Sequence, residues 1–268
     1  HPIFFAYTVF DALSFSGVFL LIAAFTAGFV DSVAGGGGLI QVPALFAVNL
    51  GQPAAGLLAN NKVASIGGTL IAAKRYLRFV KLPKLLLIPA IALSFLGSFG
   101  GAWTVTKISS DLLRIALPFA LVGLLVYTVR RPSLGDAHEP VNVGWVESVR
   151  AGLVGGVIGF YDGFFGPGTG TFLLIAFVRL FGFDFLHASA AAKMVNISTN
   201  LAAIIMFGSL GYVDWALGLF MMSANVAGSI TGTHFALKHG NRFVRSLFIY
   251  VVFALIIKTG YEALKLVI

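Results

Sequence analysis

Long apolar stretches recur along the whole chain, and short polar or glycine-rich segments separate them. Apolar runs of about 18 or more residues are typical of helices that cross a bilayer. Backbone groups in lipid must find hydrogen-bond partners within the protein, so only helices and closed barrels span a membrane. Barrel strands are short alternating segments, unlike these runs. The pattern therefore predicts an all-α polytopic membrane protein.

The pattern also repeats at a constant offset of 131 residues. The run 28–31 (GFVD) returns as 159–162 (GFYD), and Lys62 returns as Lys193. Two glycines of the first half, Gly97 and Gly101, have equivalents in the second half at the same offset. A single register without gaps over nearly half of the chain indicates an internal duplication.

Each half is expected to hold about five helical segments. They are 14–33, 39–49, 56–74, 84–106 and 112–130 in the first half, and 146–164, 170–181, 187–208, 215–237 and 243–264 in the second. At about 1.5 Å per residue, the short second segment of each half cannot cross a hydrocarbon core of about 30 Å. We expect broken or re-entrant helices at these places, and whether the segment spans or re-enters stays open.

Charge orients the two halves. Segment 74–84 carries five basic residues and no acidic one, whereas its equivalent, 205–215, carries only Asp214. Basic loops next to membrane helices lie in the cytoplasm, so the two equivalent loops should lie on opposite faces. The halves are then inverted-topology repeats, an architecture typical of secondary transporters.

This topology gives the expected domain organisation. Residues 1–130 form the first membrane repeat, 131–147 a cytoplasmic linker and 148–268 the second, inverted repeat. We expect a multi-pass protein of a bacterial-type inner membrane, with both termini outside and the basic loops 74–84, 130–150 and 238–245 in the cytoplasm. The formal net charge of +8 then reflects this asymmetry and does not indicate nucleic-acid binding.

Glycine-rich breaks precede both short segments. Glycine permits a positive φ and proline removes a helical hydrogen bond, so either residue interrupts a helix. The short helix that follows begins with unpaired N–H groups and the positive end of its dipole, which suits an anion. Close helix packing is the alternative role. The candidates are Gly35, Gly36, Gly37 and Gly38 in the first half, and Gly166, Gly168 and Thr169 in the second.

Each half has one lysine inside an apolar segment. Lys62 is the only charged residue between positions 32 and 73, and Lys193 is the only one between 185 and 213. A lysine within a membrane is costly unless it faces a partner or a wet cavity. Polar side chains follow each lysine at i+3 and i+7, Ser65 and Thr69 after Lys62 and Asn196 and Asn200 after Lys193, and Asn60 and Asn61 extend the first stripe. The candidate substrate site takes from these Asn61, Ser65, Asn196 and Asn200 beside the two lysines.

Two acids lie four residues before the glycine breaks, Asp31 and Asp162. They are candidates for proton coupling, since a carboxylate beside a cationic site could take up a proton as an anion moves. The alternatives are a role in ordering the helix end, and a structural ion pair with Lys62 or Lys193. A structural ion pair is compatible with anion binding by the lysines if a carboxylate holds each lysine until the substrate arrives.

The chain contains no cysteine, and its histidines lack metal-ligand spacing. We therefore expect neither a metal nor a cofactor. Nor do we find a set of nucleophile, base and orienting residue, so catalytic residues are not expected and the chain is not interpreted as an enzyme.

Several motifs resemble the sulfite exporter TauE/SafE family. In the first half they are AGFVDSVAGGGGLIQVPALF and ANNKVASIGG, and in the second GFYDGFFGPGTGTFLL, AAAKMVNISTNLAAIIMFGSLGYVDWALGL and NVAGSITGTHFALKHG. The resemblance extends over essentially the whole chain. It implies transport of small anions, often sulfur oxyanions or sulfonates, with the glycine loops, Lys62, Lys193, Asn196 and Asn200 as the functional core. Asn60 replaces a threonine common in the family, and we expect it to affect which anion fits.

The leading hypothesis is a secondary transporter that moves sulfite or an organosulfonate by alternating access. A passive channel for the same anions is the alternative. A cation transporter stays open if Asp31 and Asp162 are the exposed ligands. The expected partners are a small anionic substrate and the lipid bilayer, and a homodimer is left open.

Overall fold

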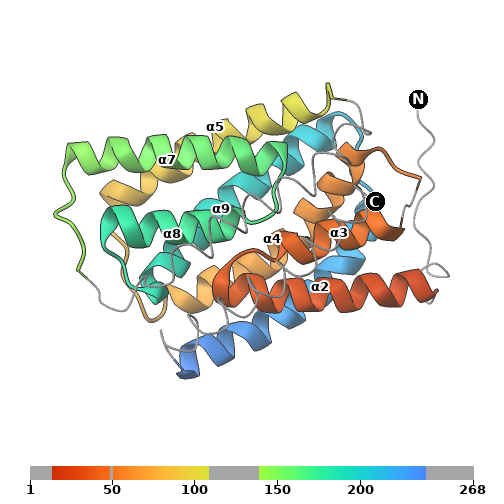
Figure 1. The fold of residues 1–268 in the computed structure, drawn as a ribbon, viewed down its shortest axis with the longest axis horizontal. Helices are drawn as coiled ribbons and strands as arrows, with labels where there is room; N and C mark the ends of the chain where they lie inside the picture. Colours follow the sequence, from red (N-terminus) through yellow and green to blue (C-terminus); the bar gives the residue numbers. More distant parts are fainter. Residues whose placement is uncertain (1–13, 49–50, 109–138, 240–268) are drawn as a thin grey trace, which may run out of the picture.

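Every apolar segment that the structure covers is an α-helix (Figure 1). The structure is a computed structural model that describes residues 14–48, 51–108 and 139–239, and these residues contain no β-strand. The helices are α2 (Phe15–Ala34), α3 (Gly38–Val48), α4 (Ala54–Tyr76), α5 (Lys84–Val105), α7 (Trp145–Phe164), α8 (Thr169–Phe181) and α9 (Phe185–Ser209), followed by a helical segment over 215–239. Among them α2, α5 and α9 are long and apolar enough to cross a membrane.

The predicted segments agree with these helices to within about two residues at each end, so this part of the prediction is confirmed. Segments 112–130 and 243–264 lie outside the described residues, as do both termini and residues 131–138 of the linker. The last three residues assigned to the linker are the start of α7, which begins at Trp145.

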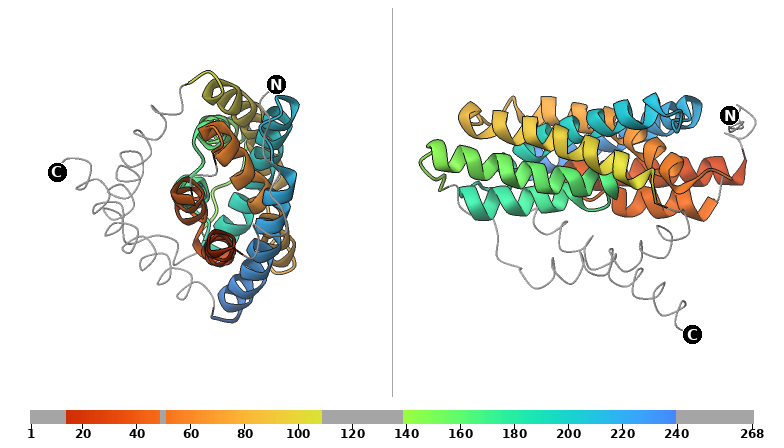
Figure 2. Two further views of the ribbon diagram at one scale, coloured as in Figure 1. Left: turned by 90° about the vertical axis from the view of Figure 1, so that its right-hand side faces the viewer. Right: turned by 90° about the horizontal axis from the view of Figure 1, so that it is seen from above.

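Two helical hairpins organise the described part (Figures 1 and 2). In each hairpin a long helix is followed by a glycine loop and a short helix that runs back beside it: α2 with α3, and α7 with α8. The hairpins come from opposite ends of the molecule, and their glycine loops meet near its middle. The short helices therefore return towards the end from which their hairpin entered.

The loops that the charge pattern distinguished lie at opposite ends of the helices (Figure 1). The basic loop between α4 and α5 is at the same end as the start of α7, whereas the turn after α9 is at the other end. Residues 139–141 also reach this first end. There the N–H groups of Glu139 and Val141 donate to the carbonyl oxygens of Gly182 and Phe181, at 2.9 and 3.2 Å.

Small residues allow the long helices to pack closely. Gly155, Gly159 and Gly163 of α7 rest against the backbone of α5, and a Cβ atom on any of them would overlap that backbone. The equivalent contact in the other half joins segment 215–239 to α2, where Gly228 and Gly232 meet the backbone of α2. Such small-residue contacts are a common basis of helix association in membranes, where burial of apolar surface supplies little driving force.

We predict that Gly159→Ala destabilises the protein by about 1–3 kcal/mol, because the added methyl would overlap the backbone of Ser94. Gly100→Ala on α5 is the matched control, since the nearest atom to its added Cβ would be 3.9 Å away. Alanine favours a helix over glycine by up to about 1 kcal/mol, so the control should be neutral or stabilising. Thermal unfolding in detergent measures both, and equal midpoints would contradict the close crossing.

Candidate functional site

The site lies where the two glycine loops touch. Gly35 packs directly on the backbone of Gly170 and Thr171, and a Cβ on Gly38 would sit 3.3 Å from Cα of Pro167. Gly35 and Gly166 occupy equivalent positions and have φ values of 73° and 93°, a region that residues with a side chain rarely adopt. The expected positive φ and close backbone approach are both present.

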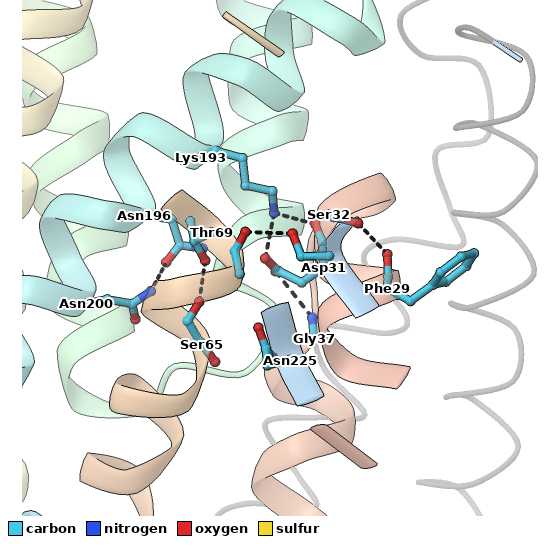
Figure 3. A network of polar contacts seen from close by, with 12 residues as sticks. Phe29, Asp31, Ser32, Gly37, Ser65, Thr69, Lys193, Asn196, Asn200 and Asn225 are labelled. Carbon is cyan, nitrogen blue, oxygen red and sulfur yellow. Dashed lines mark hydrogen bonds and ion pairs between the residues drawn. The ribbon is translucent and has the colours of Figure 1, made fainter. Parts of the chain in front are cut away.

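Two buried ion pairs cross between the halves at this junction. Lys62 Nζ lies 2.7 Å from Asp162 Oδ1, and Lys193 Nζ lies 2.7 Å from Asp31 Oδ2 (Figure 3 shows the second pair). The lysine of each half therefore binds the acid of the other half, and the two pairs are equivalent under the sequence repeat. The ion pairs that the sequence left as one alternative are thus observed.

Pairing is what makes these charges tolerable in the interior. Removing an ion from water costs several kcal/mol even after the protein relaxes, and a hydrogen-bonded partner of opposite charge offsets this cost. Both lysine side chains are at most 3% exposed, as is that of Asp162, whereas Asp31 is 18% exposed. The two pairs leave the junction without net charge, provided that all four groups are ionised.

The Lys193–Asp31 pair is built into the end of α2. Lys193 Nζ also donates to the backbone oxygen of Asp31, which accepts from the N–H of Gly35 at 3.0 Å as well. The other carboxylate oxygen of Asp31 lies 3.4 Å from the N–H of Gly37. This pair therefore joins α9 to α2 and to the first glycine loop, and it uses both carboxylate oxygens.

The Lys62–Asp162 pair has fewer bonds. Within the described residues, Asp162 Oδ2 is buried and has no hydrogen-bond partner, although Asp162 Oδ1 binds Lys62. The Lys62 ammonium lies beside the second glycine loop, since a Cβ on Gly166 would be 3.2 Å from it. A ligand that binds the Lys62 ammonium would have to replace one hydrogen bond to Asp162, whereas a ligand on Lys193 would have to replace two to Asp31.

A polar cavity adjoins the Lys62–Asp162 pair. The volume of the cavity itself is about 20 Å³. That space suits about one water molecule and no sulfonate. The cavity is lined by Asp31, Gly36, Gly38, Asn61, Lys62, Ser65, Thr69, Asp162, Gly166, Gly168, Thr169, Gly170, Asn196 and Asn200.

Most of the residues predicted for the site line this cavity, and three do not. Gly35 is covered by Gly170, Gly37 faces the carboxylate of Asp31, and Lys193 lies behind Asp31. Gly170 belongs to the glycine-rich run of the second half, and its contribution to the lining was not predicted.

The polar side chains along the cavity are partly engaged with each other. Asn200 Nδ2 donates to Asn196 Oδ1 at 3.2 Å (Figure 3), and the Thr69 hydroxyl donates to the backbone oxygen of Ser65 at 2.9 Å. The Thr169 hydroxyl donates to the oxygen of Gly166 at 2.8 Å. Asn61 Oδ1, in contrast, is buried without a hydrogen-bond partner in the described part of the chain.

Gln41 is a buried polar residue behind the site that the sequence did not single out. Its Nε2 donates to the backbone oxygen of Asn61 at 3.3 Å, and its Oε1 accepts from Asn225 Nδ2 at 3.0 Å. Gln41 therefore connects α3 to α4 and to segment 215–239. Its only sequence signal was an amide within an apolar segment.

Asn60 points away from the cavity, so the expectation that it adjusts the fit of the anion is not supported. Its Nδ2 donates to Gln52 Oε1 at 2.8 Å, and its Oδ1 accepts from the N–H of Asp214 at 2.9 Å. Gln52 Nε2 donates in turn to Asp214 Oδ2 at 3.3 Å. Asn60 thus fixes the start of α4 to the turn before segment 215–239.

The described residues contain no group of three or more His, Asp or Glu side chains placed to hold a metal ion. The groups available to a ligand at the junction are an ammonium, two carboxylates, amides, hydroxyls and the amino-terminal ends of α3 and α8. These groups bind through charge and hydrogen bonds.

Sequence comparisons relate the chain to known membrane proteins. The sequence model of the family described as "Sulfite exporter TauE/SafE" matches residues 20–259. The probable membrane transporter protein YfcA of Escherichia coli K12 is 36% identical over 246 residues, which cover 91% of this chain and 89% of that protein. The probable membrane transporter protein ORF9 of Sinorhizobium sp. is also 36% identical, over 90% of both chains.

A third relative, from Haemophilus influenzae, is again named a probable membrane transporter protein and is 34% identical over 91% of this chain and 94% of its own length. No solved structure matches the chain. The family and its relatives indicate a multi-pass membrane transporter and not an enzyme. The chain belongs to the sulfite exporter TauE/SafE family.

Proposed function

We propose that this chain is a secondary transporter that moves small anions, sulfite or an organosulfonate, across the inner membrane by alternating access. The observation that carries the proposal is the pair of crossed ion pairs where the glycine loops touch. Discontinuous helices that meet at a central site are typical of secondary transporters.

The chemistry of the junction suits an oxyanion. An ammonium group offers three N–H donors, and the amino-terminal ends of α3 and α8 add the positive ends of their helix dipoles. Asn196, Asn200 and Ser65 supply polar groups along the same cavity. An anion that replaces the carboxylate of Asp162 on Lys62 would exchange one charged hydrogen bond for another, which lowers the cost of its desolvation.

Substrate movement requires a change of shape. The cavity is too small for a sulfonate as it stands, so the anion has to separate elements that now touch. The contact between the glycine loops joins the two hairpins, and these approach from opposite ends of the molecule. Shifting one hairpin against the other would open the site to one side at a time.

The proposed membrane topology follows the charge pattern. The loop between α4 and α5 and the residues before α7 lie at one end of the molecule, and we assign that end to the cytoplasm. The halves 1–130 and 148–268 are then inverted repeats, with both termini outside. A cavity too small for the anion favours a transporter over a passive channel.

We predict that Lys62→Gln lowers the release of sulfite from loaded proteoliposomes by at least about tenfold, because it removes the charge that faces the cavity. Lys74→Gln is the control, since this exposed lysine lies outside the site and its loss should leave the flux unchanged. A flux for Lys62→Gln that equals wild type would refute the site.

Removing one partner of a buried ion pair leaves the other charge uncompensated and costs about 3–5 kcal/mol. Both Lys62→Gln and Lys193→Gln should therefore lower stability, but only Lys62→Gln also removes a charge that lines the cavity. We expect both variants to have a clearly lower unfolding midpoint in detergent than Lys74→Gln. An unchanged midpoint of Lys193→Gln would show that the bond from α9 to Asp31 does not hold the end of α2.

Ligand binding provides a direct test of the substrate class. Purified protein is heated with sulfite, thiosulfate, sulfate, sulfoacetate or a simple carboxylate. A ligand present at about 100 times its dissociation constant should stabilise the folded protein by about 2.7 kcal/mol. We expect a sulfur oxyanion or sulfonate to raise the unfolding midpoint of wild type but not of Lys62→Gln. Stabilisation by sodium alone would favour a cation transporter.

A further inference from the structure

We infer that Asp162, and not Asp31, takes up one proton for each monovalent anion that binds. This inference rests on the proposed function. It goes further because it assigns the coupling ion, its stoichiometry and the residue that carries it. The two acids are equivalent in the sequence repeat, so a choice between them can come only from the structure.

The first observation is the difference in bonding between the two carboxylates. Asp31 uses one oxygen for Lys193 at 2.7 Å, and its other oxygen faces the N–H of Gly37 at 3.4 Å. Asp162 uses one oxygen for Lys62 at 2.7 Å, but its Oδ2 is buried without a hydrogen-bond partner in the described residues. Asp31 Oδ1 is occupied by the glycine loop, whereas Asp162 Oδ2 is available to accept a proton.

The second observation is the position of Asp162. Its side chain is only 2% exposed, and the residue lines the same cavity as Lys62. A bare carboxylate oxygen is an expensive group to bury, and it becomes a hydrogen-bond donor once it is protonated. The unpartnered Asn61 Oδ1, which belongs to another lining residue, is an acceptor and not a competing donor.

Charge balance links this proton to the anion. In the described part of the chain, the charged groups around Asp162 are Lys62 on α4 and the Asp31–Lys193 pair between α2 and α9. The hydroxyl of Tyr161, the preceding residue, donates a hydrogen bond to the backbone oxygen of Pro167 at 2.7 Å. The two ion pairs sum to zero. A bound monoanion would leave the buried site at −1, and one proton returns it to zero.

The proposed exchange conserves atoms and charge. The anion binds Lys62, which stays an ammonium, and the hydrogen bond from Lys62 Nζ to Asp162 Oδ1 breaks. Asp162 then takes a proton from hydronium on the open side, and a new O–H bond forms at Oδ2. When the anion leaves on the other side, this proton passes to water and the ion pair re-forms. Sodium is a less suitable companion, because the Lys62 ammonium lies at the other oxygen of the same carboxylate.

The test uses ethanesulfonate, a monoanion that does not itself titrate near neutral pH. In proteoliposomes with a pH gradient of one unit, coupling of one proton to one anion should concentrate it about tenfold, because one unit corresponds to a tenfold ratio. Asp162→Asn should abolish this accumulation and retain exchange of labelled for unlabelled anion without a gradient. Glu139→Gln, which neutralises an exposed acid outside the cavity, is the control and should still accumulate the anion.

A pH-sensitive dye in weakly buffered detergent solution gives an independent readout. Binding of ethanesulfonate to wild type and to Glu139→Gln should remove about one proton from solution per anion, as the charge balance of the two intact ion pairs requires. Asp162→Glu should restore the uptake that Asp162→Asn loses. Wild type that binds ethanesulfonate without taking up a proton would contradict the inference even if Asp162→Asn fails to fold.

Two results overturn this inference alone: wild type that exchanges ethanesulfonate without accumulating it, and accumulation or proton uptake that is kept in Asp162→Asn. Wild type that neither binds nor exchanges any of the sulfur oxyanions and sulfonates tested would overturn the proposed function, and the inference with it.

Discussion

The structure depends on burying four charges at the contact between two glycine loops. Each lysine binds an acid of the opposite half, so neither half can satisfy its own charges. The cost of an unpaired buried charge therefore acts as a force that holds the halves together. The glycines make this possible, because a side chain at Gly35 or Gly170 would keep the loops apart.

We propose that the same interaction makes the junction responsive to ligands. An ion pair at the centre of a transporter can be opened by another charged group at little net cost, whereas an apolar contact cannot. The two pairs differ in this respect: Asp31 is bound on both oxygens and holds the end of α2, and Asp162 is bound on one. Equivalent residues of the sequence repeat therefore differ in their bonding, and we propose a structural role for Asp31 and an exchange role for Asp162.

Much of this arrangement could be predicted from the sequence. The apolar pattern located the helices, and the constant offset marked Lys62 and Lys193 as equivalent. The crossed pairing could not be predicted, because spacing along the chain does not say which acid a lysine meets across a contact between halves. The orientation of the Asn60 side chain could not be predicted for a similar reason. Asn60 neighbours Asn61 and Lys62 in the sequence, but its side chain faces Gln52 and Asp214. Helical position fixes the face of a side chain only when the helix packing is known.

The central claim is that an anion takes the place of a carboxylate on Lys62 at the junction of the two hairpins. A structure determined by electron cryomicroscopy with a bound sulfonate tests it most directly. The account predicts the sulfonate oxygens next to Lys62 Nζ and the amino-terminal end of α8, with the Lys62–Asp162 contact broken and the Lys193–Asp31 contact kept. A sulfonate bound elsewhere while both ion pairs remain intact would contradict it.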